Sequence, residues 1–64
     1  MLESPTQQLR TRLRAAIERH GENEVVRVTQ SSRAAVERVL SGLVIRSGTR
    51  ALLEAELPKL ELTK

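Results

Sequence analysis

The chain has 64 residues and a formal net charge of +3 at pH 7, and it contains no cysteine, phenylalanine, tyrosine or tryptophan. This length fits one small domain, which hides only about 60% of its unfolded surface on folding and therefore has a thin stability margin. The composition excludes disulfides, cysteine-ligated metal sites and an aromatic platform for stacking single-stranded bases. The core must therefore be built from Leu, Val, Ile and Ala.

Arginine is concentrated in the first fifty residues. Residues 10–50 hold nine arginines against four glutamates, whereas residues 51–64 are net acidic by one. A basic surface indicates a polyanion or an acidic protein as partner, and arginine suits bidentate contacts with phosphate and guanine. No apolar run approaches the roughly 20 residues that cross a bilayer, and the N-terminus lacks a signal-peptide pattern, so we expect a soluble cytoplasmic protein with no membrane partner.

The first expected helix covers residues 5–20. Ser4 can accept a hydrogen bond from a free backbone N–H, and Pro5 fits the first helical position. Gly21 can close the helix in the left-handed conformation. One face carries the apolar stripe Leu9, Leu13, Ala16, Ile17 and His20. For His20, the only histidine, a partly buried ring or a favourable contact with the helix end is a sufficient explanation.

A second, short helix is expected over the segment EVVRV, residues 24–28, with Asn23 as its cap. The valines of this segment are β-branched and mildly disfavour a helix. A strand is therefore nearly as well supported by the local sequence.

The third expected helix covers residues 31–41. Ser31 or Ser32 can cap it, and Gly42 can end it with a positive φ that costs glycine nothing. A projection at about 100° per residue separates two faces. Ala35, Val36, Val39 and Leu40 form a core face, and Arg33, Ala34, Glu37, Arg38 and Ser41 form a short cationic outward face.

A fourth helix is expected over RALLEAEL, residues 50–57, with Thr49 as its cap and Pro58 as its stop. The tail KLELTK, residues 59–64, alternates polar and apolar residues, which is typical of either a frayed end or an edge strand. We therefore expect one all-α domain over residues 1–64, a compact bundle of four short helices whose C-terminal end is extended or a strand.

The order of helix, short helix, tight turn and short helix with a polar outward face is that of a helix-turn-helix. The stretch EVVRVTQSSRAAVERVLSGLVIRSGT resembles the lambda-repressor and Cro-like helix-turn-helix family. The resemblance covers residues 23–57, with the motif at residues 23–40. It rests on the start Ser32-Arg33 and on Val36, Leu40 and Gly42, which fall at the spacing that the family uses.

Three positions depart from the family's pattern. The family usually has alanine where Val26 stands, glycine where Gln30 stands and an apolar residue where Ser31 stands. Because glutamine with a positive φ is uncommon, the turn is either longer here or strained at Gln30.

The resemblance implies a small transcriptional regulator of the repressor or Cro type, which binds double-stranded DNA sequence-specifically by inserting residues 31–41 into the major groove. Arg33 would pair with guanine O6 and N7, a contact worth roughly 1–3 kcal/mol of discrimination. Ala34 would touch a thymine methyl, and Glu37 would accept from cytosine or orient Arg33. The implied phosphate contacts are Asn23, Ser31, Ser32, Arg38, Arg46 and Arg50.

Useful specificity from so few base contacts would favour a homodimer on two half-sites about 34 Å apart. The C-terminal region, including the tail at residues 58–64, has no obvious core to join. Leu57, Leu60 and Leu62 are therefore the expected dimer contacts.

Two other functions fit the same helical fold: a protein-interaction or assembly module with an acidic partner, and a nonspecific architectural DNA-binding protein. The arginines also have ordinary explanations. Pairs spaced i, i+4 add only a few tenths of a kcal/mol on a solvated helix, and these pairs are Arg14–Glu18, Arg33–Glu37 and Arg50–Glu54. Arg10, Arg12, Arg14 and Arg19 flank the apolar stripe of the first helix, a pattern more typical of covered core edges than of a binding surface.

An enzyme is not expected. The chain has no aspartate and no cysteine, so a Ser-His-Asp triad and a cysteine nucleophile cannot be assembled within it. Its three glycines are isolated and form no phosphate-binding loop. We expect no cofactor, no metal and no small-molecule substrate, and a place on the nucleoid.

Overall fold

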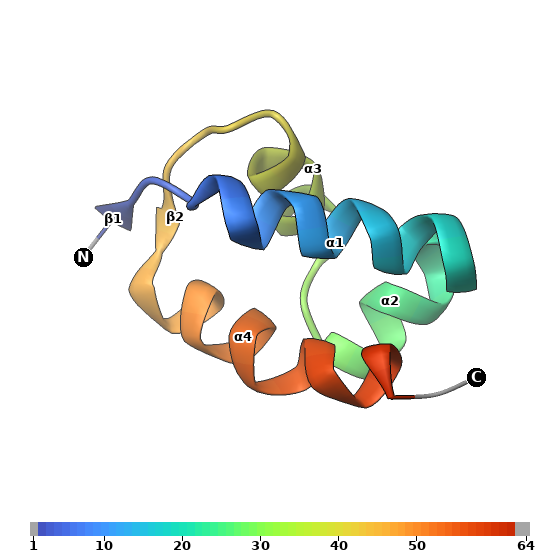
Figure 1. Cartoon of the computed structure of the whole chain (residues 1–64). Helices are drawn as coiled ribbons and strands as arrows, with labels where there is room; N and C mark the ends of the chain where they lie inside the picture. Colours follow the sequence, from blue (N-terminus) through green and yellow to red (C-terminus); the bar gives the residue numbers. More distant parts are fainter. Residues whose placement is uncertain (1, 63–64) are drawn as a thin grey trace.

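Four helices and one pair of short strands make up the structure, a computed structural model that describes residues 2–62 (Figure 1). The expectation of a small all-α bundle is confirmed. The elements in chain order are β1 (Leu2–Glu3), α1 (Gln7–His20), α2 (Glu22–Thr29), α3 (Arg33–Leu40), β2 (Ile45–Arg46) and α4 (Ser47–Glu61). The strands pair antiparallel, with Leu2 opposite Arg46 and Glu3 opposite Ile45. This pairing joins the N-terminal segment to the start of α4.

Helix α1 begins later than the sequence predicts. Its N-cap is Thr6 and not Ser4, because the Thr6 Oγ1 accepts a first-turn backbone N–H at 3.0 Å. Pro5 lies before the helix and is buried, so it does not occupy the first helical position. At the other end Gly21 has a φ of 89°, and its N–H donates to the Ile17 carbonyl at 2.8 Å. Its ψ of 151° differs from the left-handed helical geometry that was expected.

Helix α2 forms despite its β-branched valines. Val25 is fully buried, and Val26 and Val28 pack against the edge of the core. Burial of an amphipathic face outweighs the small propensity differences between residues. The helix already begins at Glu22, and no side chain caps it. Asn23 therefore lies inside the first turn, and the prediction that it caps the helix is wrong.

A turn of residues 30–32 joins α2 to α3. Gln30 adopts φ 57° and ψ 25°, in the left-handed region that L residues rarely visit. Of the two alternatives, the short turn with an unusual Gln30 is therefore the one present. Ser32 caps α3 by accepting the Ala35 N–H at 3.0 Å, whereas Ser31 is buried and does not cap it.

Gly42 ends α3, as the sequence predicts. It has a φ of 77°, and its N–H donates to the Val39 carbonyl at 3.1 Å. The next residue, Leu43, donates its N–H to the Arg38 carbonyl at 2.9 Å. These two bonds form a Schellman motif, in which a positive φ at the glycine turns the chain out of the helix.

Helix α4 extends beyond both predicted ends. It begins before Thr49, the expected cap, and continues through Pro58, the expected stop. A proline inside a helix removes one backbone bond and crowds the preceding turn, at a cost of about 3 kcal/mol. Burial of Leu57 and Leu60 on either side of the proline offsets this cost, since they are 0% and 3% exposed. The predicted extended tail is therefore helical up to residue 61, and its residues 63 and 64 lie outside the described part.

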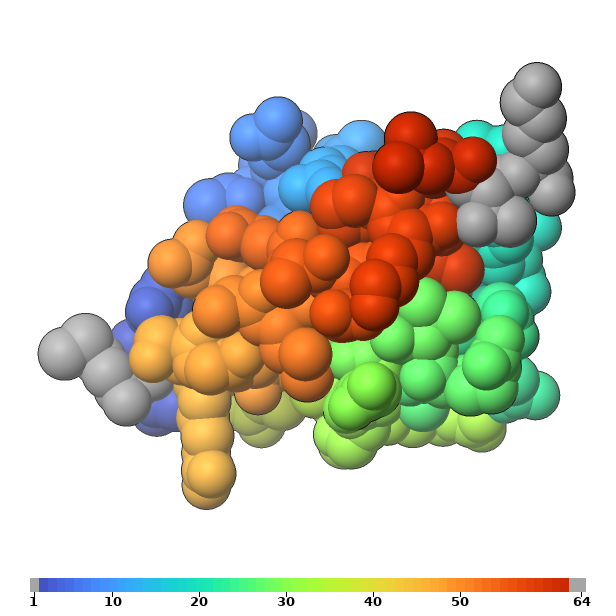
Figure 2. All heavy atoms as spheres, turned by 90° about the horizontal axis from the view of Figure 1, so that it is seen from below, coloured from blue at the N-terminus to red at the C-terminus, as the bar shows by residue number. Residues whose placement is uncertain are grey.

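The core lies between the four helices, with β2 at one end (Figure 1). Seen from below, α4 crosses the face of the molecule and α2 lies beside it (Figure 2). The buried apolar residues come from every helix and from β2. They are Leu9, Leu13, Ala16, Val25, Val36, Val39, Ile45, Leu53, Leu57 and Leu60.

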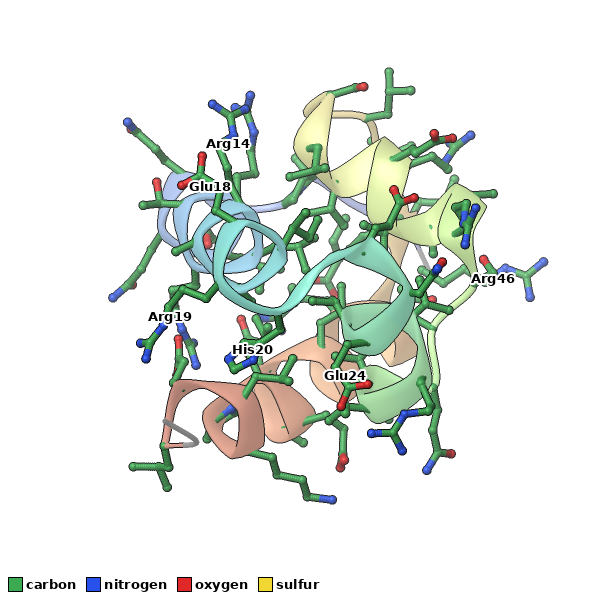
Figure 3. The ribbon with its side chains drawn as sticks, turned by 90° about the vertical axis from the view of Figure 1, so that its right-hand side faces the viewer. Arg14, Glu18, Arg19, His20, Glu24 and Arg46 are labelled. Atoms are coloured by element: carbon green, nitrogen blue, oxygen red, sulfur yellow. The ribbon has the colours of Figure 1, made fainter. Side chains whose placement is uncertain are left out.

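Side chains of α1 hold the carboxyl ends of two other helices. Arg12 donates two hydrogen bonds to Glu61, at 2.7 and 2.9 Å, and these bonds hold the pKa of that carboxylate below its usual value. His20 points from the end of α1 towards α4 (Figure 3), and its Nε2 lies 3.0 Å from the Leu60 carbonyl. Because a carbonyl only accepts, Nε2 carries a proton. Arg10 reaches the last carbonyl of α3, at Leu40, with an N–O distance of 3.4 Å.

Candidate nucleic-acid interface

The outward face of α3 is exposed along its whole length. Arg33, Ala34 and Glu37, the three residues expected to reach base edges, are all exposed. Val36 and Val39, on the opposite face, are fully buried in the core. The helix repeat alone separates these faces, so the sequence was sufficient to place them.

Arg33 is held against the start of α2. Its Nη2 donates to the Asn23 Oδ1, and its Nε lies 3.4 Å from the Glu22 Oε1. The predicted ion pair of Arg33 with Glu37, one turn along α3, is not formed within residues 2–62. The guanidinium therefore links the amino-terminal ends of α2 and α3 and remains more than half exposed.

The contact with Arg33 fixes the orientation of the Asn23 amide. A guanidinium only donates hydrogen bonds, so the amide oxygen must face it. Within residues 2–62 the Asn23 Nδ2, which has two N–H donors, makes no hydrogen bond and can therefore donate to an outside partner. This orientation suits the phosphate contact expected of Asn23, although the residue does not cap α2.

Arg38 is bound to the loop that follows α3. Its Nε and Nη2 donate to the Val44 carbonyl, at 3.1 and 3.0 Å. A guanidinium has five N–H donors, so three of them make no hydrogen bond within residues 2–62 and can donate to an outside partner. The sequence predicted the exposure of Arg38 but not this contact, which sets the path of the chain from α3 to β2.

The two arginines at the start of α4 differ in their surroundings. Arg50 is paired with Glu3 at 2.6 Å and with Glu54 at 3.0 Å, and the charge of Glu3 is the main cause that raises its pKa. A phosphate would therefore have to compete with two carboxylates for the Arg50 guanidinium. Arg46 is exposed and points away from the ribbon (Figure 3), and within residues 2–62 it makes no ion pair.

The two serines before α3 also differ. Ser32 is exposed at the amino end of the helix, where its hydroxyl accepts the Ala35 N–H. Ser31 is only 7% exposed. A buried hydroxyl cannot reach a phosphate, so the expected phosphate contact of Ser31 is wrong.

An apolar hollow beside α3 could not be predicted from the sequence. It has a volume of about 240 Å³ and is lined by Leu2, Ala34 and Val44, among others, with Arg38 and Arg46 also in its wall. Leu2 and Val44 are 62% and 38% exposed. The hollow exists because the pairing of β1 with β2 brings the N-terminal segment to the side of α3.

The leucines expected to form a dimer contact are mostly in the core. Leu57 and Leu60 are 0% and 3% exposed, so they face the inside of the same chain and not a partner. That assignment is wrong for both residues, because α4 continues through Pro58 and carries them inward. Leu62 is 84% exposed and is the remaining member of the set.

The opposite side of the molecule carries the outer face of α1. Arg14, Glu18 and Arg19 lie there, far from Arg46 (Figure 3). Arg14 and Glu18 do not form the predicted ion pair within residues 2–62, whereas Arg50 and Glu54 do form theirs. Of the arginines on α1, Arg10 and Arg12 contact other helices, as their place at the edge of the core suggested.

No family model, curated protein or solved structure matches this chain. The resemblance to the helix-turn-helix family therefore stays a prediction that rests on the quoted residues. None of the helices within residues 2–62 has the length and apolar content that a membrane crossing needs.

Proposed function

We propose that this protein binds double-stranded DNA sequence-specifically, with α3 in the major groove, as a small transcriptional regulator on the nucleoid. The observation that carries the proposal is the α2–turn–α3 arrangement with an exposed outward face on α3. An α-helix fits the major groove, where each base pair presents a distinct set of donors and acceptors.

The side chains of that face support a division into residues that read bases and residues that contact phosphates. Arg33 is at the first position of α3, where its end would meet a base edge, and a guanine offers two acceptors to it. Ala34 and Glu37 follow on the same face. The favoured phosphate contacts are Asn23, whose amide N–H groups make no hydrogen bond within residues 2–62, and the exposed Arg46. Ser32 and Arg38 are further candidates.

We further propose that two copies act together on half-sites about 34 Å apart, since one unit of this size makes few base contacts. Neither Leu57 nor Leu60 contributes to this dimer, because both belong to the core. Sedimentation of the protein with and without a palindromic duplex measures its oligomeric state directly. A monomer on every duplex would reject the dimer.

The first experiment is selection of bound fragments from a randomised duplex pool at near-physiological salt, followed by sequencing. We expect an enriched inverted repeat. In the same assay Arg33→Ala should relax the preference at one position by a factor that corresponds to roughly 1–3 kcal/mol. An unenriched pool with weak, salt-sensitive retention would replace specific binding with a nonspecific architectural role.

A protein-interaction role is the second candidate, and the hollow beside α3 favours it. Exposed apolar side chains next to Arg38 and Arg46 suit a segment that is both apolar and acidic. The two functions differ in their salt dependence, because DNA binding releases counterions and weakens steeply with salt. Affinity for DNA that is negligible at physiological salt would favour the protein partner.

A further inference from the structure

We infer that Glu22 and Asn23 are positioning residues for Arg33, and that they contribute to sequence preference without touching a base. This role rests on the proposed function. Both residues lie on the first turn of α2, and both contact the guanidinium of Arg33 at the start of α3. Neither contact was expected from the sequence, where Asn23 was assigned to a phosphate and Glu22 had no role.

The contacts occupy one edge of the guanidinium. The Nε lies against the Glu22 carboxylate, and one N–H of Nη2 donates a hydrogen bond to the Asn23 Oδ1. The other edge, with the two N–H groups of Nη1 and one of Nη2, stays unoccupied within the described residues. Two parallel N–H groups at that end match the O6 and N7 acceptors of guanine.

Holding the side chain in this way lowers the entropy that Arg33 loses when it binds a base. An unrestrained arginine has several rotamers, and it can also settle on the nearest phosphate of any sequence. The Glu22 carboxylate opposes that second outcome, because it repels a phosphate that approaches the Arg33 guanidinium beside it. Removing the carboxylate should therefore strengthen binding to unrelated DNA more than binding to the preferred site.

The test compares Glu22→Gln with Glu24→Gln. Both substitutions remove one negative charge from the first turn of α2, but Glu24 is paired with Arg27 and not with Arg33. The quantity measured is the ratio of affinities for the selected duplex and for an unrelated duplex. We expect Glu22→Gln to lower this ratio by about three- to tenfold, a part of what one bidentate base contact supplies. Glu24→Gln should change both affinities by the same factor.

A double-mutant cycle shows whether Glu22 acts through Arg33. In the background of Arg33→Ala, the effect of Glu22→Gln on the affinity ratio should disappear. An equal loss of the ratio with and without Arg33 would overturn the positioning role. An unchanged ratio in Glu22→Gln alone would overturn it as well, and would leave only a general charge effect.

The free protein gives a second readout that needs no DNA. The Nε–H resonance of Arg33 should exchange slowly with water in the wild type and in Glu24→Gln, and rapidly in Glu22→Gln. Rapid exchange in the wild type would reject the inference while leaving the proposed function intact. A wild type that binds every duplex equally would reject the proposed function, and the specificity role with it.

Discussion

Arginine side chains of the same chemistry have different surroundings in this fold. Arg12 is paired with Glu61, whereas Arg46 makes no ion pair within residues 2–62. The sequence was sufficient to predict that Arg33 and Arg46 are exposed, since exposure follows from position on a helix or loop. The partner of Arg12 could not be predicted, because Glu61 lies 49 residues further along the chain. Which arginines are paired within the described residues is therefore a property of the fold.

Arg46→Ala should weaken binding to all duplexes alike. Its side chain makes no ion pair in the described part of the chain, so its loss removes the proposed phosphate contact and little stability. The slope of log affinity against log salt should fall by about one. Arg14→Ala is the matched control, since Arg14 is exposed on the opposite side (Figure 3). Equal losses for the two variants would mean that binding responds to net charge and not to this face.

Gln30→Gly should stabilise the protein. The left-handed conformation costs an L residue roughly 1–2 kcal/mol and costs glycine almost nothing. Glycine also increases the conformational entropy of the unfolded chain, which offsets part of this stabilisation. We expect a net gain of about 0.5–1 kcal/mol in the free energy of unfolding, measured in urea. Gln30→Ala, which keeps the steric cost, should lie within about 0.5 kcal/mol of the wild type. A destabilised glycine variant would show that the Gln30 side chain itself stabilises the turn.

The helices differ in how far local sequence predicted them. The boundaries of α3 were predicted well, because Ser32 and Gly42 are local signals that the structure uses directly. The boundaries of α4 were not, because the stop signal of Pro58 is outweighed by burial of the leucines around it. Local signals decide a boundary only where tertiary burial does not oppose them.

Leu60→Ala should unfold much of the protein, whereas Leu62→Ala should be nearly neutral. Truncating a buried leucine costs about 2–5 kcal/mol, a large part of the stability of so small a domain. Leu62 is 84% exposed, and its truncation should change the free energy of unfolding by less than about 0.5 kcal/mol. Thermal unfolding followed by circular dichroism measures both. Equal, small effects would contradict the continuation of α4 into the core.

At the scale of the molecule, the proposed interface joins segments that are distant in sequence. The α3 face comes from one helix, but the hollow beside it also needs Leu2 from β1 and Val44 from the loop before β2. The sequence indicated no pairing of these two segments, since each strand has only two residues and no alternating pattern of useful length. The two short helices and the turn between them were therefore predictable, and the surface around them was not.

Acid should weaken the contact between α1 and α4. The hydrogen bonds from Arg12 hold the pKa of Glu61 below the ordinary value of 4.5 in the folded protein. The stabilisation is therefore complete above pH 4.5 and is lost as the pH falls through the lowered folded pKa. For a partly exposed pair it amounts to at most about 1 kcal/mol.

Urea unfolding of the wild type and of Glu61→Gln as a function of pH measures this contribution. The difference in unfolding free energy should be largest near neutral pH and should shrink in acid. Glu18→Gln is the control, because Glu18 is exposed and makes no ion pair within residues 2–62. A difference that persists unchanged in acid would show that Glu61 stabilises the helix end by packing and not by its charge.

The two-strand pairing decides where anything fused to this protein will lie. β1 lies at one end of the molecule and the last turn of α4 at the other (Figure 1), and the longest dimension is 33 Å. A purification tag or reporter joined ahead of Leu2 would emerge at the hollow beside α3. A fusion at the other terminus would emerge near the end of α4, away from that surface. Binding measurements and reporter fusions should therefore carry their attachments at the C-terminus.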